Sequence, residues 1–268
     1  MERYRSLRQR LVVVAVLGLV AARAPGLDAA LLDDLERLHE ADRHEQIVRV
    51  IDQTLARLTD PSDRAQLLWR KTRAELTIAD QGRWRGDLTD SDTISRLEAA
   101  AAHADDAIEL APDIAEPYFW KGAAIGLQGQ IRGVLNSLFM AQSLRDYAEM
   151  TLERDPGHAE AHYMLGQLYS ELPGWPISFG DRDRAVRHAR LSIELHEEAY
   201  QAGRIHVRYY DFYTQLAASL WRRNSRGDRD EARRVLSDNL ERLQALSSPT
   251  TRQRMDLELA RTLGAGWS

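Results

Sequence analysis

The run Asp155-Pro-Gly-His-Ala-Glu-Ala-His-Tyr-Met-Leu-Gly-Gln-Leu-Tyr169 decides the fold of this chain, because one helix must end within it and another must begin. Pro156 has no backbone N–H and biases Asp155 away from the helical region, so the preceding helix stops here. From Ala159 onward, apolar residues return at helical spacing. Gly166 has no side chain, which lets a neighbouring helix approach closely. The run therefore predicts a joint between repeated helical units.

The same run resembles the joint between two tetratricopeptide repeats (TPRs). Each such repeat has about 34 residues in two helices, and its first helix carries an aromatic residue, then Leu-Gly, then Tyr. His162, the pair Leu165-Gly166 and Tyr169 take these places here. The resemblance implies an all-α, right-handed, TPR-like helical solenoid with capping helices, a fold that binds other molecules.

The predicted units are longer than a plain repeat. The intervals between Pro61, Pro112, Pro156 and the equivalent Glu197 all exceed the usual length of about 34 residues. We expect the excess to form inserts between the first and second helix of each unit, at residues 81–86, 126–138 and 171–180. Such inserts would emerge along one edge of the stack.

Oversized units with three particular runs resemble the regulator-of-microtubule-dynamics type of repeat protein and its bacterial relatives. The runs are Ala115-Glu-Pro-Tyr-Phe-Trp120, Asp155-Pro-Gly-His-Ala159 and Leu172-Pro-Gly-Trp175. The resemblance covers roughly Trp69 to Leu240. A second resemblance is to the repeat-containing periplasmic subunit associated with substrate-binding-protein-dependent transporters. It implies a protein without enzymatic activity that holds a partner or ligand.

These patterns divide the chain into four parts. We expect a signal peptide or N-terminal anchor at 1–29, a helical hairpin or cap at 30–60, about four enlarged TPR-like repeats at 61–248, and a capping helix with a tail at 249–268.

The first residues predict export. Four arginines, Arg3, Arg5, Arg8 and Arg10, precede the apolar run Leu11–Ala22, as in a signal peptide. That run is shorter than the roughly 20 residues that span a bilayer as a helix. We expect cleavage near residue 29 and a periplasmic or secreted protein, with an uncleaved inner-membrane anchor as the alternative.

Composition argues against several classes of function. The formal net charge of −5 and the pI near 5.9 do not suit a nucleic-acid-binding protein, which needs a basic face. With no cysteine, there is no disulfide and no thiolate nucleophile. Phosphate-cradling, dinucleotide-binding and nucleophile-elbow motifs are also missing from the sequence. We therefore predict that the protein is not an enzyme and has no cofactor.

The histidines offer one candidate metal site. His158 and His162 lie four residues apart on one predicted helix, a spacing that can hold a metal ion. No third ligand lies near them in the sequence, so we predict no metal. His188 and His196 fall on a charged helix and are predicted to be solvated.

The concave face is the first candidate surface for a partner. In this type of repeat, certain positions of the first helix line the concave face. In this sequence, acidic and aromatic residues occupy those positions, and the Lys/Arg pair that would bind a terminal carboxylate is absent from them. A basic or mixed partner segment fits this lining. The predicted binding residues here are Glu116, Phe119, Glu160, Tyr163, Gln167, Asp211 and Thr214, with Ala123 and Ala218 beside them.

The insert loops are the second candidate surface, because aromatic and arginine side chains are frequent anchors of interfaces. The predicted residues are Arg83, Trp84, Arg85, Trp175 and Phe179. Trp175 has two interpretations: it contacts a partner directly, or it folds back over the adjacent helices.

The sequence thus favours a non-catalytic scaffold for protein–protein interaction in the bacterial cell envelope. The alternative is a periplasmic ligand-binding accessory subunit of a substrate-binding-protein-dependent transporter. A deep apolar pocket with a few converging polar groups would favour the alternative, and an open groove would favour a peptide or protein partner. A perturbed pair of acids buried in a cleft would favour an enzyme.

Overall fold

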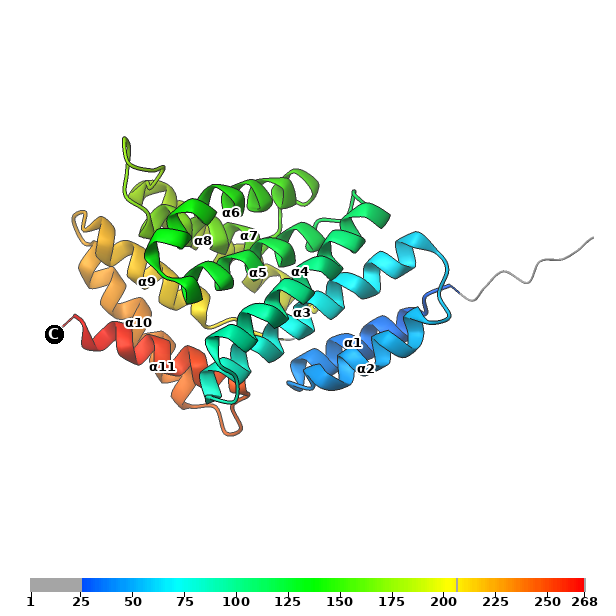
Figure 1. Cartoon of the computed structure of the whole chain (residues 1–268). Coiled ribbons are helices and arrows are strands. Elements are labelled where there is room, and N and C mark those ends of the chain that lie inside the picture. The colour runs from blue at the N-terminus through cyan, green and yellow to red at the C-terminus, as the bar shows by residue number, and fades with distance from the viewer. Residues whose placement is uncertain (1–25, 206, 268) are drawn as a thin grey trace, which may run out of the picture.

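The computed structural model describes residues 26–205 and 207–267, which form helices and turns without a strand (Figure 1). The predicted signal peptide falls almost wholly outside these residues. Within the described part, no helix has both the length and the apolar character needed to cross a membrane. The eleven helices of this part are α1 (Ala29–Glu40), α2 (His44–Leu55), α3 (Pro61–Arg85), α4 (Asp90–Leu110), α5 (Glu116–Arg132), α6 (Val134–Arg154), α7 (Ala159–Glu171), α8 (Arg182–Gln201), α9 (Asp211–Arg223), α10 (Asp228–Gln244) and α11 (Thr251–Ala265).

Successive helices pack as hairpins, α3 with α4, α5 with α6, α7 with α8 and α9 with α10, and each pair stacks on the next. Separate apolar clusters fill the spaces between neighbouring pairs. This stacking of units that contact their neighbours is the organisation of a solenoid. The prediction of an all-α, TPR-like helical solenoid is confirmed.

The joint between α6 and α7 shows why the sequence folds this way locally. Asp155 is extended and ends α6, and the His158 side chain caps α7 by accepting a hydrogen bond from the Ala161 backbone N–H at 3.3 Å. Gly166 lies against α8, where a Cβ atom would be 3.2 Å from the Ala189 backbone nitrogen. The two helices of this unit therefore approach closely at the glycine.

Two of the three expected insert loops are helical instead. Residues 81–85 continue α3, and Gly86, in the left-handed conformation (φ 79°), ends that helix. Residues 126–138 belong to α5 and α6, which meet at Gly133 (φ 96°). The loop prediction was wrong for these two segments because extra turns of helix bury their own residues, including Gln81 and Gly82.

The third insert is a loop, between the end of α7 and the start of α8. It closes on itself through a hydrogen bond from the Gly180 N–H to the Pro173 carbonyl (3.0 Å). A Cβ atom at residue 180 would lie 2.0 Å from the Leu172 carbonyl oxygen, so only glycine fits. The loop therefore has a defined compact shape with its tip directed away from the helices (Figure 1).

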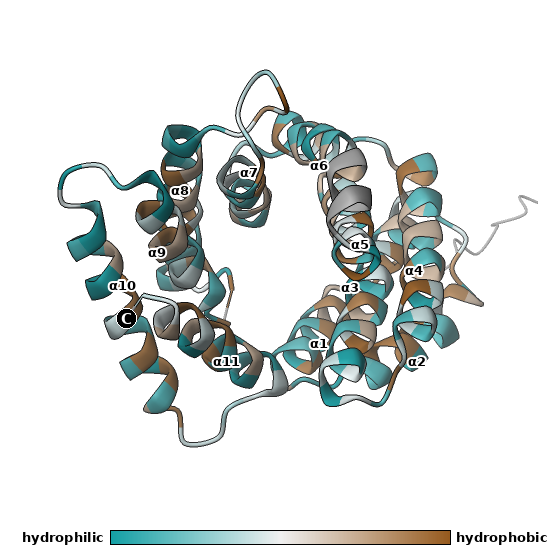
Figure 2. Cartoon of the chain, turned by 60° about the vertical axis from the view of Figure 1, so that its left-hand side comes forward, coloured by the Kyte–Doolittle hydropathy of each residue, from teal (hydrophilic) through white to brown (hydrophobic). Residues whose placement is uncertain are grey.

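The solenoid curves until its two ends meet (Figure 2). The last helix, α11, packs against α9, α10 and also α3. The Thr251 backbone N–H donates to Asp42 Oδ2 (2.9 Å), and Trp84 Nε1 donates to Glu258 Oε2 (3.0 Å). These contacts join residues from opposite ends of the chain and close the helices into a ring.

Candidate binding cavity

The ring encloses a cavity of about 900 Å³. Its lining comes chiefly from the inner helices α3, α5, α7, α9 and α11, together with the turns around residues 42 and 209. The concave face of the solenoid has therefore become the wall of a central space. Two parts of this wall differ sharply in chemistry.

The first part, which we call the apolar wall, comes from α5, α6 and α7. Phe119 packs edge-on against Trp120, with 4.9 Å between ring centroids. A close approach of helices supports this wall, since a Cβ atom on Gly122 would lie 3.0 Å from the Tyr147 Cβ atom on α6 and 3.5 Å from the Met164 side chain. The apolar wall consists of Phe119, Trp120, Leu127, Leu144 and Met164.

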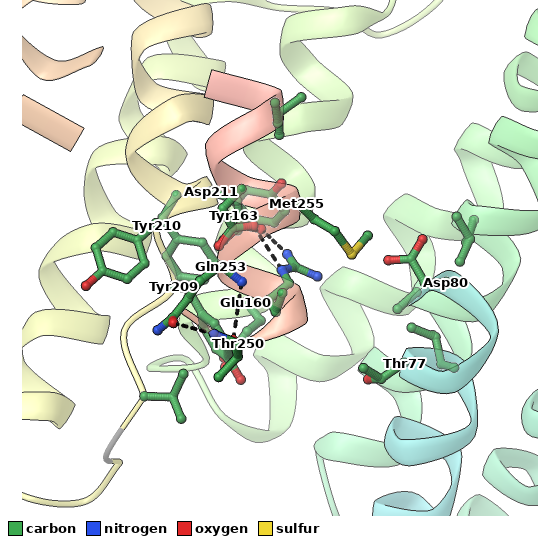
Figure 3. A pocket seen from close by; sticks show the side chains of 18 of the residues that line it. Thr77, Asp80, Glu160, Tyr163, Tyr209, Tyr210, Asp211, Thr250, Gln253 and Met255 are labelled. Carbon is green, nitrogen blue, oxygen red and sulfur yellow. Dashed lines mark hydrogen bonds and ion pairs between the residues drawn. The ribbon is translucent and has the colours of Figure 1, made fainter. Parts of the chain in front are cut away.

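The second part, which we call the charged wall, comes from α3, α9 and α11 and consists of Asp80, Asp211, Arg252 and Asp256. Arg252 donates from Nη2 to Asp211 Oδ2 (2.5 Å) and from Nε to Asp256 Oδ1 (3.1 Å). Both carboxylates are almost completely buried. Figure 3 shows the Asp80 side chain directed from α3 toward Met255 and the Asp211 region.

Burial changes the proton affinity of the charged wall. Removal from water raises the pKa of Asp256 to about 7, although the neighbouring Arg252 opposes this shift. Burial likewise raises the pKa of Asp80. Asp211 holds the pKa of Arg252 well above its ordinary value, so the guanidinium stays charged. The wall therefore has one fixed cation among three acids.

Aromatic rings border the charged wall. Tyr163 stacks on Phe212, with ring centroids 4.8 Å apart and planes 17° apart. Tyr209 packs beside the same phenylalanine at 5.6 Å. Burial raises the pKa of Tyr163 well above its ordinary value, so its hydroxyl remains protonated. These rings form an aromatic cluster next to the acids.

The structure places most of the residues predicted for the concave face around the cavity. Phe119, Glu160, Tyr163, Gln167 and Asp211 all line it, together with Ala123.

Three other predicted residues lie elsewhere. Thr214 is in the core between α9 and α10, where its hydroxyl accepts a hydrogen bond from Asn239 Nδ2 (3.1 Å), so the prediction that it faces a partner was wrong. Ala218 is buried. Glu116 is the first residue of α5 and lies outside the cavity lining. Burial lowers the pKa of the nearby Arg70, and the charge of Glu116 partly opposes that shift.

The three residues predicted for the first insert loop lie at the end of α3 and beside it. Arg83 pairs with Asp90 and Arg85 pairs with Asp87, each at 2.7 Å. Trp84 faces the cavity through its contact with Glu258. They do not form one loop surface, because the helix sends their side chains in different directions.

The aromatic residues of the third insert behave differently from each other. Trp175 is 90% exposed at the loop tip, so it does not fold back over the helices. Phe179 does fold back: it packs edge-on against Tyr169 at 6.0 Å, and the Arg145 guanidinium lies 4.6 Å from its ring.

The histidines form packing contacts. His162 Nδ1 lies 3.0 Å from His188 Nδ1, and His188 also stacks on Tyr169. His196 is buried and accepts a hydrogen bond from the Tyr209 backbone N–H (3.2 Å). The prediction that His188 and His196 are solvated was wrong, because α7 of the same unit covers His188, and Tyr209 and Phe212 of the next unit cover His196. Among the described residues, no group of three or more His, Cys, Asp or Glu residues is placed to hold a metal ion.

Sequence reasoning missed Asp80, Arg252 and Asp256. Asp80 was given no role from the sequence, and α11 was treated only as a cap. One signal was available: Arg252 and Asp256 have the i, i+4 spacing of an ion pair on one helix face. Nothing in the sequence indicated that this pair would meet α3.

Comparison with known proteins identifies the family. Residues 31–174 match the family described as regulator of microtubule dynamics protein 1-3. The chain belongs to this family. The match spans α1 to α7, and therefore the apolar wall and Asp80, whereas Asp211, Arg252 and Asp256 lie beyond it.

A solved structure is also similar, that of "MamA protein". It shares 17% sequence identity with this chain and gives a TM-score of 0.42, over 82% of this chain and 97% of that one. The search of curated proteins gives no match.

Proposed function

We propose that this protein is a non-catalytic TPR-like scaffold that holds an extended segment of a partner protein in its central cavity. The observation that carries the proposal is the cavity itself, about 900 Å³ in volume and lined by aromatic and acidic side chains from the inner helices. Inner faces of such solenoids form extended concave binding surfaces. Here the closed ring surrounds the bound segment instead of offering one open side.

The buried acids of the charged wall suit binding better than catalysis. A raised pKa beside a second acid is a feature of acid–base catalysts. However, Arg252 pairs with one oxygen of Asp211 and one oxygen of Asp256, so these acids already act as a binding site for a cation.

The proposed location is the bacterial cell envelope. The support is the arginine-flanked apolar run at residues 11–22. Intact-mass measurement of the protein from a periplasmic fraction tests this: a chain beginning near residue 30 supports export, and a cytoplasmic chain that retains residues 1–29 contradicts it.

Photo-crosslinking in cells tests the scaffold proposal. The photoreactive residue p-benzoylphenylalanine replaces Gln167 or Met255, which line the cavity, or Glu194, which is exposed on the outer helix α8. We expect adducts with the same partner peptide from both cavity positions and not from position 194. Adducts only from position 194, or no protein adduct at all, would contradict the proposal.

A ligand-binding accessory of a transporter is the second candidate. The observation that favours it is the volume of the cavity, which lies in the range of about 300–1,000 Å³ typical of small-molecule pockets. Native mass spectrometry of the full chain, purified without denaturation, separates the two. A stoichiometric small molecule in the absence of any protein adduct supports the accessory role, and a ligand-free chain with cavity adducts contradicts it.

A further inference from the structure

The central cavity carries more negative than positive charge. Seven acids line it, against two arginines, Arg208 and Arg252. A cavity with one sign of charge and low-dielectric walls concentrates ligands of the opposite sign. The acids are Glu40, Asp42, Asp80, Glu160, Asp211, Asp256 and Glu258.

Two carboxylate oxygens of the charged wall have no hydrogen-bond partner within the described part of the chain. They are Asp211 Oδ1 and Asp256 Oδ2, and both side chains are only 4% exposed. A buried acceptor without a partner costs stability, because it has lost its hydrogen bonds to water. Two such acceptors on one cavity wall therefore mark a place where a donor is missing.

One guanidinium cannot neutralise the whole wall. Arg252 pairs with both Asp211 and Asp256, while Asp80 on α3 is attracted to Arg252 and Arg83 only at longer range. In the protein alone, a proton on Asp256 compensates part of this charge near neutral pH, because burial raises its pKa to about 7. A cationic group of a ligand would compensate the same negative charge and would displace the proton from Asp256.

The surroundings of the acids fit the stem of a long cationic side chain. Tyr163 is stacked on Phe212 and Tyr209 is tilted against it, so an aromatic cluster borders the acids, and Met255 lines the same part of the cavity (Figure 3). Lysine and arginine side chains place their methylene groups along such apolar surface while the charged end reaches polar groups. Aromatic faces also attract the cation directly.

We propose that the charged wall is a subsite for a lysine or arginine side chain of the bound segment, held between Asp80 on α3 and the Asp211–Asp256 pair on α9 and α11. This inference rests on the proposed function, that the cavity holds a peptide segment of a partner. It adds the chemical identity of the residue that the cavity selects.

The test measures residue preference with a defined probe. A positional-scanning library of N-acetylated hexapeptide amides is presented to the full chain, and the retained peptides are sequenced. The same is done with Asp80→Asn and Asp256→Asn, which keep side-chain size and remove charge. Asp230→Asn is the matched control, because that side chain is 82% exposed on the outer helix α10.

We expect lysine and arginine to be enriched at one or two positions of the retained peptides. For a peptide chosen from this pool, replacing that lysine by norleucine should weaken binding by about tenfold or more, as should each of the two cavity variants. The control variant should bind like the parent. All variants are first checked for folding by circular dichroism and urea unfolding.

Proton release gives an independent readout. Titration calorimetry at pH 7 in two buffers of different ionisation enthalpy should show protons leaving the protein on binding, and fewer with Asp256→Asn. The groups that influence Asp256 come from four elements: Arg252 on its own helix, Asp211 on α9, Tyr163 on α7 and Asp80 on α3.

The possible failures are distinguishable. Retained peptides without lysine or arginine enrichment overturn the subsite and leave the peptide-binding function standing. No retained peptide at all overturns the proposed function as well. A free diamine, 1,5-diaminopentane, is titrated in parallel: binding as tight as that of the best peptide supports the cation site but assigns it to a small amine, in favour of the accessory role.

Discussion

The two walls of the cavity are built by different means. The apolar wall joins neighbouring units along the chain, through packing that includes the contact between Gly122 and Met164. The charged wall joins α3 with α9 and α11, which lie at opposite ends of the solenoid and meet only when the ring closes. The apolar wall therefore stabilises the stack. The charged wall depends on ring closure and contains acids whose oxygens lack some of their hydrogen-bond partners.

Removing an aromatic ring from the apolar wall should have the largest effect. Phe119→Ala deletes a buried side chain at the centre of the cluster between α5 and α7, and such a change costs about 3–5 kcal/mol. Urea unfolding followed by circular dichroism measures it. Trp175→Ala, at the exposed loop tip, is the control and should change stability by less than about 0.5 kcal/mol. Equal losses for the two variants would refute this role of the apolar wall.

Removing the cation from the charged wall should come second. Arg252→Met leaves Asp211 and Asp256 buried without their ion pair, and breaking a fully buried pair costs about 3–5 kcal/mol. The Arg252 side chain is itself 42% exposed, so we expect a smaller loss of roughly 2 kcal/mol. Arg261→Ala, exposed on the same helix, should have little effect. An Arg252→Met variant as stable as the parent would show that the acids need no partner.

The charged wall should also make stability depend on pH. Asp256 has a pKa of about 7 when folded, against a reference value of 3.8. Between these values the folded state binds more protons than the unfolded state, so this group's contribution to stability falls as pH rises from about 4 to 7.

Asp256→Asn should remove that decline. The variant should gain stability relative to the parent between pH 5 and pH 8, as measured by urea unfolding at each pH. Asp80 acts in the same direction as Asp256, because burial raises its pKa. Asp42 acts in the opposite direction: although burial opposes it, hydrogen bonds from His44, Gln81 and Thr251 lower its pKa. A parallel pH profile for parent and variant would contradict the raised pKa of Asp256.

Weakening ring closure should have the smallest effect on stability. Trp84→Phe removes the hydrogen bond to Glu258 at a partly exposed position, which should cost less than about 1 kcal/mol. The consequence should instead be a broader distance distribution between spin labels at Asp87→Cys and Arg261→Cys. The sequence contains no cysteine, so labelling is selective. The distance distribution of a control label pair at Glu194→Cys and Asp238→Cys should not change. If the distribution between positions 87 and 261 does not change either, the Trp84–Glu258 hydrogen bond does not hold the ring closed.

Part of the cavity lining could be predicted from the sequence. Phe119, Glu160 and Tyr163 were placed correctly on the inner face, because the position of a side chain around a helix follows from its register with the repeat. Thr214 occupied an equivalent register but is buried, since α10 covers that side of α9. Register alone does not tell which inner positions a neighbouring helix covers.

Most helices and their order of stacking could be predicted from local sequence signals. Local signals were sufficient for this: prolines that stop helices, capping residues such as Asp60 and His158, and small residues at close contacts such as Gly166. Each acts on its own helix or on the next one in the chain, so its effect does not depend on the curvature of the whole stack.

The closure of the stack, and with it the shared wall of Asp80, Asp211 and Asp256, could not be predicted from local signals. Closure sums small rotations over all the units, and it brings residues such as Asp42 and Thr251 into contact across nearly the whole chain. The charge and burial of the site arise from that closure, since each acid alone would lie on a solvated helix face. The pKa of an acid, the cavity beside it and its missing hydrogen-bond donor all depend on the groups around that acid. In a ring, those groups come from both ends of the sequence.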